Sequence, residues 1–280
     1  MKPRLKVSFS GGRTSGFMAY QIKKHWSDVF DVVFIFANTG FEHPDTLRFA
    51  NDVDTLLGLN LVWVEAVVHH GDRVASTHKV VDYKTASRQA EPFYQVASKY
   101  GLPNRTFRLC NREMKLNPMR SYIEDELGWG KDYDTAIGIR ADEKRRVSKN
   151  MDIQRILYPL IDTWPSTKQD ILDFWEEYAC DLKIPEHLGN CLTCFQKSDA
   201  KLNQVYREFP NAFQVFADFE KLYGGVGPNV EPGPRKIFRM KRDTPTLIKT
   251  FKLADADSSK LFDTAESGGC SESCEPYDFE

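Results

Sequence analysis

Short apolar segments alternate with amphipathic helical segments along the N-terminal part of the chain, and this alternation strongly restricts the fold. Residues 5–9 and 59–64 have the length and composition of strands, and residues 31–37 (DVVFIFA) form a continuous apolar run. Such a run is typical of a parallel strand that is covered on both faces. Helical patterns follow the first two strands, and the second helix begins at Pro44 and ends before Gly58. Because parallel strands are joined by right-handed crossovers, we predict an α/β fold with a doubly wound, mostly parallel sheet.

The remainder of the chain divides near residue 222. We expect residues 67–130 to be mostly helical and loop-like, with a helix at 118–127, and residues 134–139 to form a fourth strand. After Tyr223 the composition changes to Gly- and Pro-rich sequence, and from Ala254 onward Asp, Ser, Glu and Gly predominate. The sequence therefore predicts a main domain over residues 1–222 and a helical and irregular C-terminal extension over residues 223–280.

Charge and cysteine content narrow the class of protein. The formal net charge is -2 at pH 7, so the chain as a whole is not strongly attracted to nucleic acid or membranes. The sequence has no signal-peptide pattern and no apolar run of membrane-spanning length, and we expect a cytoplasmic protein without membrane contact. The six cysteines are more typical of metal binding or redox chemistry than of a disulfide framework in such a chain.

A glycine-containing loop, SGGRTS at residues 10–15, joins the first strand to the first helix. Gly11 and Gly12 let the backbone approach a ligand closely, and the start of the helix offers unpaired N–H groups. The spacing of residues in this loop fits neither the Walker nor the dinucleotide-binding pattern. A tight turn without a ligand is the simpler alternative, but the position at the carboxyl end of the first strand favours an anion-binding site.

The loop resembles the PP-loop, SGGxxS, of the ATP pyrophosphatase or adenine nucleotide α-hydrolase-like superfamily. Three further stretches are similar to the phosphoadenosine phosphosulfate (PAPS) reductase-like branch of that superfamily: NTGFEHP at 38–44, CNREMKLNP at 110–118 and GIRADE at 138–143. The resemblance spans about residues 5–200. It implies a PP-loop, Rossmann-like fold that binds an adenine nucleotide, either ATP or an adenylyl sulfate.

The resemblance also implies roles for individual residues. The phosphates would be held by Ser10, Gly11, Gly12, Arg13, Thr14 and Ser15, while Asn38, Thr39 and Gly40 would lie near adenine or ribose. Lys115 and Arg140 would reach the phosphate or sulfate end. Many members have Lys-Asp where this loop has Arg13-Thr14, so the carboxylate that would assist Mg²⁺ is replaced, and magnesium is only an optional cofactor.

The cysteines predict a metal or redox centre. Cys191 and Cys194 form a CxxC pair, a spacing that chelates one ion. The pattern resembles the iron–sulfur subgroup of sulfate-adenylate reductases, which pair a CC with a CxxC, although Leu109 stands where the first of the two adjacent cysteines would be. We predict a 4Fe–4S cluster on Cys110, Cys191, Cys194 and Cys274 (or Cys270), with zinc as the alternative. A redox pair or plain buried thiols is the simplest interpretation, and Cys180 is expected to be a core residue in a helix.

The sequence is consistent with three alternative functions. The first is thiol-dependent reduction of an adenylyl sulfate, with a thiol donor such as thioredoxin as partner. The nucleophile would come from Cys270 or Cys274, although the Glu-Cys-Gly motif of the family's reductases does not occur in this tail. The second is ATP-dependent sulfur transfer, including modification of a nucleic acid, which the basic stretches at 140–149 and 234–242 could bind. The third is a non-catalytic nucleotide-binding regulator.

Overall fold

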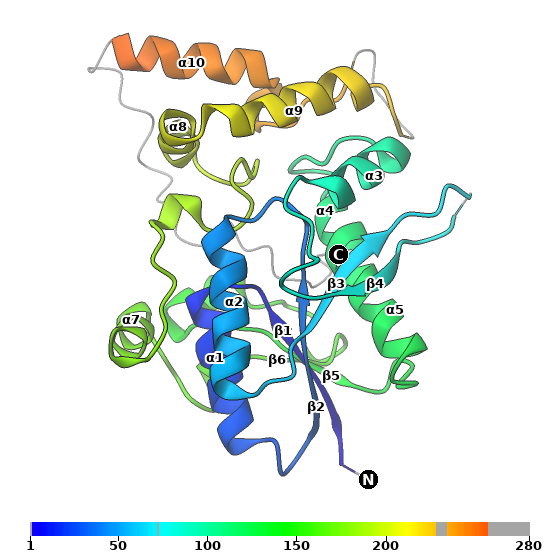
Figure 1. Cartoon of the computed structure of the whole chain (residues 1–280), viewed down its shortest axis with the longest axis vertical. Coiled ribbons are helices and arrows are strands. Elements are labelled where there is room, and N and C mark those ends of the chain that lie inside the picture. Colours follow the sequence, from blue (N-terminus) through cyan, green and yellow to red (C-terminus); the bar gives the residue numbers. More distant parts are fainter. Residues whose placement is uncertain (1, 72, 228–233, 257–280) are drawn as a thin grey trace.

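The computed structural model describes residues 2–71, 73–227 and 234–256 (Figure 1). A six-stranded sheet has the order β4-β3-β2-β1-β5-β6. It consists of β1 (Arg4–Phe9), β2 (Asp31–Ala37), β3 (Val62–Val67), β4 (Thr77–Val81), β5 (Asp134–Ala136) and β6 (Ile156–Leu157). Every pair is parallel except β3–β4. The predicted doubly wound, mostly parallel α/β fold is therefore confirmed.

Helices cover both faces of this sheet. Helices α1 (Arg13–His25), α2 (Pro44–Leu57) and α7 (Lys168–Glu177) lie on one side, and α5 (Asn117–Asp125) lies on the other (Figure 1). Alternate residues of β2 serve the two sides: Phe34 and Phe36 pack in the large core with α1 and α2, whereas Val33 and Ile35 pack against Met119 and Ile123 of α5. This two-sided burial explains why the strand is a continuous apolar run.

The antiparallel edge strand β4 was not predicted. It lies inside the segment 67–130, where we expected helices and loops, and its sequence THKVV contains three polar residues. Among the described strands, β3 alone pairs with β4, and Val80 is exposed. A strand that is short and half-solvated carries a weak apolar pattern, which is why the sequence did not reveal it.

The other helices connect and extend this core. They are α3 (Glu91–Tyr100), α4 (Leu109–Asn111), the π-helical turn η1 (Arg112–Leu116), the 3₁₀ segment η2 (Ala141–Arg146), α6 (Pro159–Asp162), η3 (Glu186–Leu188), α8 (Asp199–Glu208), α9 (Pro210–Tyr223), η4 (Arg239–Lys241) and α10 (Thr244–Ala256).

Helices α8, α9 and α10 gather at one end of the molecule (Figure 1). Phe213 of α9 contacts Phe251 of α10, and Phe216 contacts Phe41 and Phe93 beside the sheet. The domain boundary at residue 222 stays a prediction. None of the described helices combines the length and apolar character needed to cross a membrane.

Candidate functional site

The loop at residues 10–15 follows β1 at the carboxyl edge of the sheet and is shaped by its own hydrogen bonds. Gly11 has a φ of 77°, a left-handed value that glycine adopts without strain. The Ser15 hydroxyl donates to the Gly12 carbonyl at 2.9 Å and accepts from the Ser10 amide at 3.1 Å. Ser15 is buried, and its hydroxyl is engaged in these two bonds, so this side chain stabilises the loop.

The first turn of α1 is open to an anion. Its N-cap is Gly12, and among the described residues no side chain caps it and no acidic residue occupies its first turn. By contrast, the side chains of His43, Thr167 and Ser198 cap α2, α7 and α8. The unpaired N–H groups of a 13-residue helix therefore point toward the loop, where they and the helix dipole favour negative charge.

A pocket of about 230 Å³, which we call the anion pocket, opens in front of this helix start. The loop (residues 10–14), Gly138, Arg140, Arg146 and Lys168 line it on one side. The segment 182–190 contributes a further wall through Leu182, Ile184, Pro185, Glu186, Gly189 and Asn190, and Glu186 pairs with Lys168 at 3.2 Å. The loop follows β1 and Arg140 follows β5, so the pocket lies between two adjacent strands at the point where the strand order reverses. Ligands bind at this position in open parallel sheets. Arg146 and Lys168 were not among the predicted site residues.

Arg13 lines the pocket as one half of an ion pair with Asp181. Its guanidinium makes two hydrogen bonds to the Asp181 carboxylate, at 2.6 and 2.8 Å, and this hydrogen-bonded cation lowers the pKa of Asp181. The Arg13 carbonyl also accepts from the Trp175 indole at 2.9 Å. Arg13 therefore ties α1 to α7 and to the segment that forms the far wall of the pocket.

The segment at 38–40 is occupied by internal contacts. The Asn38 carboxamide donates to Glu65 at 2.6 Å and to the Ser87 carbonyl at 2.9 Å, and it accepts from the Gly40 amide. Glu65 is fully buried and also pairs with Lys79 at 2.8 Å. Asn38 is therefore a buried structural link that does not line the anion pocket, and its expected place near adenine or ribose stays a prediction.

Three predicted metal ligands line one narrow cavity. Cys110, Cys191 and Cys194 share it with Thr39 and Lys115, and the Thr39 hydroxyl lies 3.4 Å from the Cys191 sulfur. Residues 38–44 hold the CxxC segment by a β-bridge between Glu42 and Cys191 and by a bond from the Leu192 amide to the Phe41 carbonyl. Within the described residues, no three His, Cys, Asp or Glu side chains are placed to hold a metal ion. Cys270 and Cys274 lie outside the described residues.

A π-helical turn determines which side chains join Cys110. In an α-helix, a residue five positions later would point about 140° away, so Cys110 and Lys115 would face different directions. Here the Asn117 amide bonds to the Arg112 carbonyl, a bond of π-helical length. This turn brings residues five apart onto one side, and both Cys110 and Lys115 line the cavity.

Cys180 lies apart from this cavity. The expected position inside a helix was wrong, because α7 ends at Glu177 and Cys180 belongs to the following segment. Burial, together with the carboxylates of Asp52 and Asp181, raises the pKa of this thiol to about 11. Cys180 is therefore a protonated thiol at neutral pH.

The anion pocket and the cysteine cavity adjoin. Gly189 and Asn190 line the first, and Cys191 and Cys194 line the second. One short stretch of backbone therefore separates the pocket at the 10–15 loop from two thiols. The sequence could not show this proximity, because the loop and the CxxC pair are about 180 residues apart.

In the basic stretch at 234–242 the three arginines make contacts within the fold, whereas Lys236 and Lys241 are exposed. Arg235 donates to the Tyr100 carbonyl, Arg239 to the Gln196 carbonyl, and Arg242 pairs with Asp199 at 2.8 Å. These contacts anchor the C-terminal segment, and they give the stretch a structural role.

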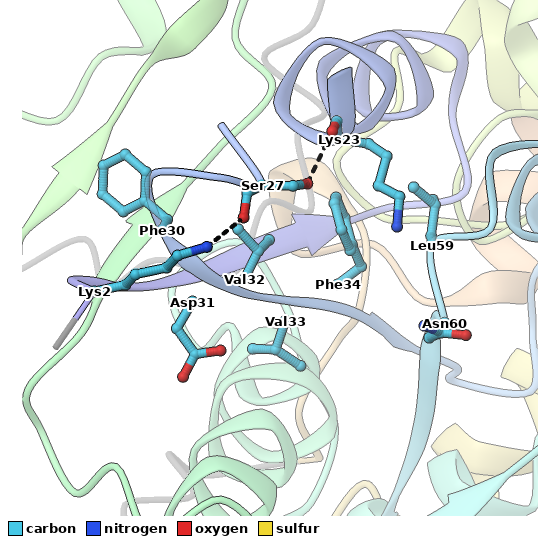
Figure 2. A pocket seen from close by; sticks show the side chains of 10 residues that line it. All are labelled: Lys2, Lys23, Ser27, Phe30, Asp31, Val32, Val33, Phe34, Leu59 and Asn60. Carbon is cyan, nitrogen blue, oxygen red and sulfur yellow. Dashed lines mark hydrogen bonds between the residues drawn. The ribbon is translucent and has the colours of Figure 1, made fainter. Parts of the chain in front are cut away.

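A larger hollow of about 470 Å³ lies elsewhere, at the amino ends of β1 and β2 (Figure 2). Its lysines make structural bonds: Lys2 donates to the Ser27 carbonyl and Lys23 to the Gly58 carbonyl. Because ligands of parallel sheets bind at the carboxyl ends of the strands, we place the functional site at the opposite edge.

The chain is an α/β protein with a doubly wound sheet, and a glycine-containing loop joins the first strand to a helix that has no side-chain cap among the described residues. This arrangement is typical of proteins that bind nucleotides. The model of the phosphoadenosine phosphosulfate reductase domain matches residues 4–157, more than half of the chain, and the chain belongs to this family within the PP-loop adenine nucleotide α-hydrolase-like superfamily.

Relatives cover most of the chain. It is 33% identical to the uncharacterized nin region protein ORF290 of Escherichia phage lambda, with 97% of this chain and 94% of the relative covered. Two uncharacterized proteins of Methanocaldococcus jannaschii are 26% and 24% identical, over 80% and 91% of this chain. The chain spans 42% and 56% of the length of these archaeal relatives.

Proposed function

We propose that the protein is an adenine-nucleotide-dependent enzyme that reduces an adenylyl sulfate with protein thiols. The observation that carries this proposal is the segment at 189–194, which lines the anion pocket with Gly189 and Asn190 and the cysteine cavity with Cys191 and Cys194. A nucleotide with its phosphate on the 10–15 loop would present its sulfate toward the thiols. Arg140, whose guanidinium lies 3.4 Å from the Thr14 hydroxyl, would hold the bridging region between phosphate and sulfate.

Two thiols at CxxC spacing suit this chemistry. The first thiolate attacks the sulfate sulfur, and the bond from that sulfur to the phosphate oxygen breaks. The oxygen leaves on the nucleotide with the electron pair, and a thiosulfonate forms on the cysteine. The second thiolate attacks the cysteine sulfur, so a disulfide forms and sulfite leaves. An external dithiol such as thioredoxin then reduces the disulfide. Cys270 and Cys274 are further candidates for either thiol.

The donor set is incomplete for a metal. Three cysteines line one cavity, which suits a thiolate-bound ion chemically, but the described residues provide no group of three that could hold one. The iron–sulfur cluster and its zinc alternative remain predictions, and iron, sulfide and zinc analysis of protein purified without oxygen tests them.

The experiment offers purified full-length protein three nucleotides: adenylyl sulfate, its 3′-phosphorylated form and ATP. We expect sulfite from one of the first two in the presence of a thiol donor. Cys191→Ser and Cys194→Ser should each abolish sulfite release, whereas Cys180→Ser, the same change outside the cavity, should retain it.

The other two functions have distinct outcomes in the same assay. Pyrophosphate release from ATP that depends on added RNA or DNA would support sulfur transfer to a nucleic acid. Binding of a nucleotide with turnover of none would support a regulator. Either result would contradict the reductase proposal, and absence of all nucleotide binding would contradict every function based on the loop.

A further inference from the structure

Two segments of the chain carry basic residues and no acidic ones. Residues 101–112 contain Arg105, Arg108 and Arg112, residues 234–242 contain five Lys or Arg residues, and neither segment contains Asp or Glu. Since the formal net charge of the whole chain is -2, a positive surface on this protein has to be local. These two segments are the candidates for such a surface.

The fold packs the two segments against each other. The Asn104 carboxamide donates to the Lys236 carbonyl at 3.4 Å, and the Arg235 guanidinium lies 4.5 Å from the centre of the Phe107 ring. Basic residues that are far apart in the sequence are therefore neighbours in the structure. We call the common surface of the two segments the basic face.

An ordered turn presents an aromatic ring on the basic face. The Asn104 side-chain oxygen accepts from the Thr106 and Phe107 amides at 3.0 and 2.8 Å, and the Asn104 amide donates to the Phe107 carbonyl at 2.9 Å. Phe107 is 38% exposed, whereas phenylalanine is usually buried. The next residue, Arg108, lines the cysteine cavity. The turn therefore holds an aromatic ring at the surface, next to that cavity.

Three cations of the basic face are exposed: Arg105, Lys236 and Lys241. Lys236 lies 3.7 Å from Asp243, but the two side chains are 43% and 36% exposed, so water and salt screen this pair. The arginines of the second segment make the contacts within the fold described above. The segment is thus anchored by its arginines and presents its lysines to solvent.

We propose that the basic face binds single-stranded nucleic acid, either DNA or RNA. The exposed cations bind the phosphates, and the Phe107 ring stacks on an unpaired base. An acidic peptide offers the negative charge without flat bases, and a duplex keeps its bases stacked inside, so a single strand matches both features of the face. This inference does not depend on the proposed reduction, because it concerns a surface outside the anion pocket.

Fluorescence anisotropy with the full-length protein and labelled single strands of about 12 nucleotides tests this proposal, with DNA and RNA in separate titrations. Affinity should fall as the salt concentration rises. We expect log K to change with log[salt] with a slope of about -2, because each phosphate contact on a single strand contributes about -0.7 and three cations are exposed. Arg105→Gln and Lys236→Gln should each make this slope less steep by about 0.7. Binding of DNA, of RNA or of both supports the proposal and identifies which sugar the face accepts.

Substitutions of Phe107 separate stacking from charge. Phe107→Leu should weaken binding at least about fivefold, the lower end of the effect of losing one base–aromatic stack, and should leave the salt slope unchanged. Phe107→Tyr keeps the ring and should bind like the wild type. Lys131→Gln removes an exposed cation just before β5, and it should change neither affinity nor slope. Melting temperatures equal to that of the wild type show that the variants are folded.

Several outcomes would overturn this inference. One is absence of oligonucleotide binding, and another is binding that Arg105→Gln, Lys236→Gln and Phe107→Leu all leave unchanged. A duplex or a poly-glutamate peptide that binds as tightly as the single strand would identify a general polyanion or acidic-protein surface, which also overturns it. The sulfite assay of the proposed function contains no oligonucleotide, so failure of either proposal leaves the other standing.

Discussion

Replacing Gly11 with alanine tests the close packing beneath the loop at residues 10–15. A Cβ atom at Gly11 would lie 2.6 Å from Thr46 Cγ2 and 3.3 Å from Phe36 Cε2. Both neighbours are buried, with exposures of 3% for Thr46 and 1% for Phe36, so neither can move away freely. The φ of 77° adds strain, because an L-residue with a side chain disfavours the left-handed region.

The two effects can be sized separately. The left-handed backbone costs alanine about 1 kcal/mol, and forcing a methyl group into a packed site costs about 1–3 kcal/mol. We therefore expect Gly11→Ala to lower the free energy of unfolding by about 2–4 kcal/mol. In thermal unfolding followed by circular dichroism, this corresponds to a fall of roughly 5–15 °C.

Gly12→Ala is the matched control. At Gly12 the φ is -100°, and among the described residues an added Cβ would meet the Ser10 hydroxyl alone within 4 Å, at 3.6 Å. We expect its melting temperature to stay close to that of the wild type, while the methyl group projects at the mouth of the anion pocket and weakens nucleotide binding. Equal melting temperatures for Gly11→Ala and Gly12→Ala would refute the packing argument.

Three further predictions concern buried or paired groups. Burial opposes ionisation of Glu113, but hydrogen bonds from Arg112, Ser76 and Asn117 outweigh this effect and lower the pKa of Glu113. Glu113→Gln should therefore lower the free energy of unfolding by about 1–3 kcal/mol at neutral pH. In urea unfolding, the stability difference between wild type and variant should shrink as the pH falls through that lowered pKa. Asp181→Asn removes the ion pair with Arg13, whose two side chains are 26% (Arg13) and 23% (Asp181) exposed. We therefore expect the free energy of unfolding to fall by only about 1 kcal/mol or less, but limited proteolysis within residues 178–190 to become faster. Unchanged proteolysis would contradict the role of this pair in holding the pocket wall. Cys180, with a pKa of about 11, should react slowly with iodoacetamide at pH 7.5 and rapidly only near pH 11. If mass spectrometry found Cys180 alkylated before the other cysteines at pH 7.5, this prediction would be contradicted.

Local patterns predicted most of the fold. The apolar run at 31–37 and the helix signals at Pro44 and Gly58 depend on residues close together in sequence, and these elements formed where expected. The loop at 10–15 was recognisable for the same reason, since glycine conformation and an open helix start are local properties. The third strand, expected at 59–64, begins at Val62 instead, because strand ends depend on pairing with neighbours.

The roles of individual side chains were less predictable. Arg13 was expected to meet a phosphate and Asn38 a base or ribose, and both roles stay predictions. The sequence did not reveal that Asp181 binds Arg13 and that Glu65 binds Asn38. Both partners come from distant parts of the chain, and a hydrogen bond between distant residues leaves no spacing pattern in the sequence. The sequence placed Arg146 only within the basic stretch at 140–149. The direction of its side chain could not be predicted, because it depends on how η2 folds.

The sequence by itself determined that this chain winds strands and helices into a parallel sheet and places a glycine loop at its carboxyl edge. Periodicity and turn chemistry suffice for that, because they act over a few residues. The family resemblance already grouped Cys110 with Cys191 and Cys194, but only the tertiary structure set their cavity next to the anion pocket. Contacts across the fold decide such neighbourhoods, since they depend on how separate elements pack and not on the order of residues within any one of them.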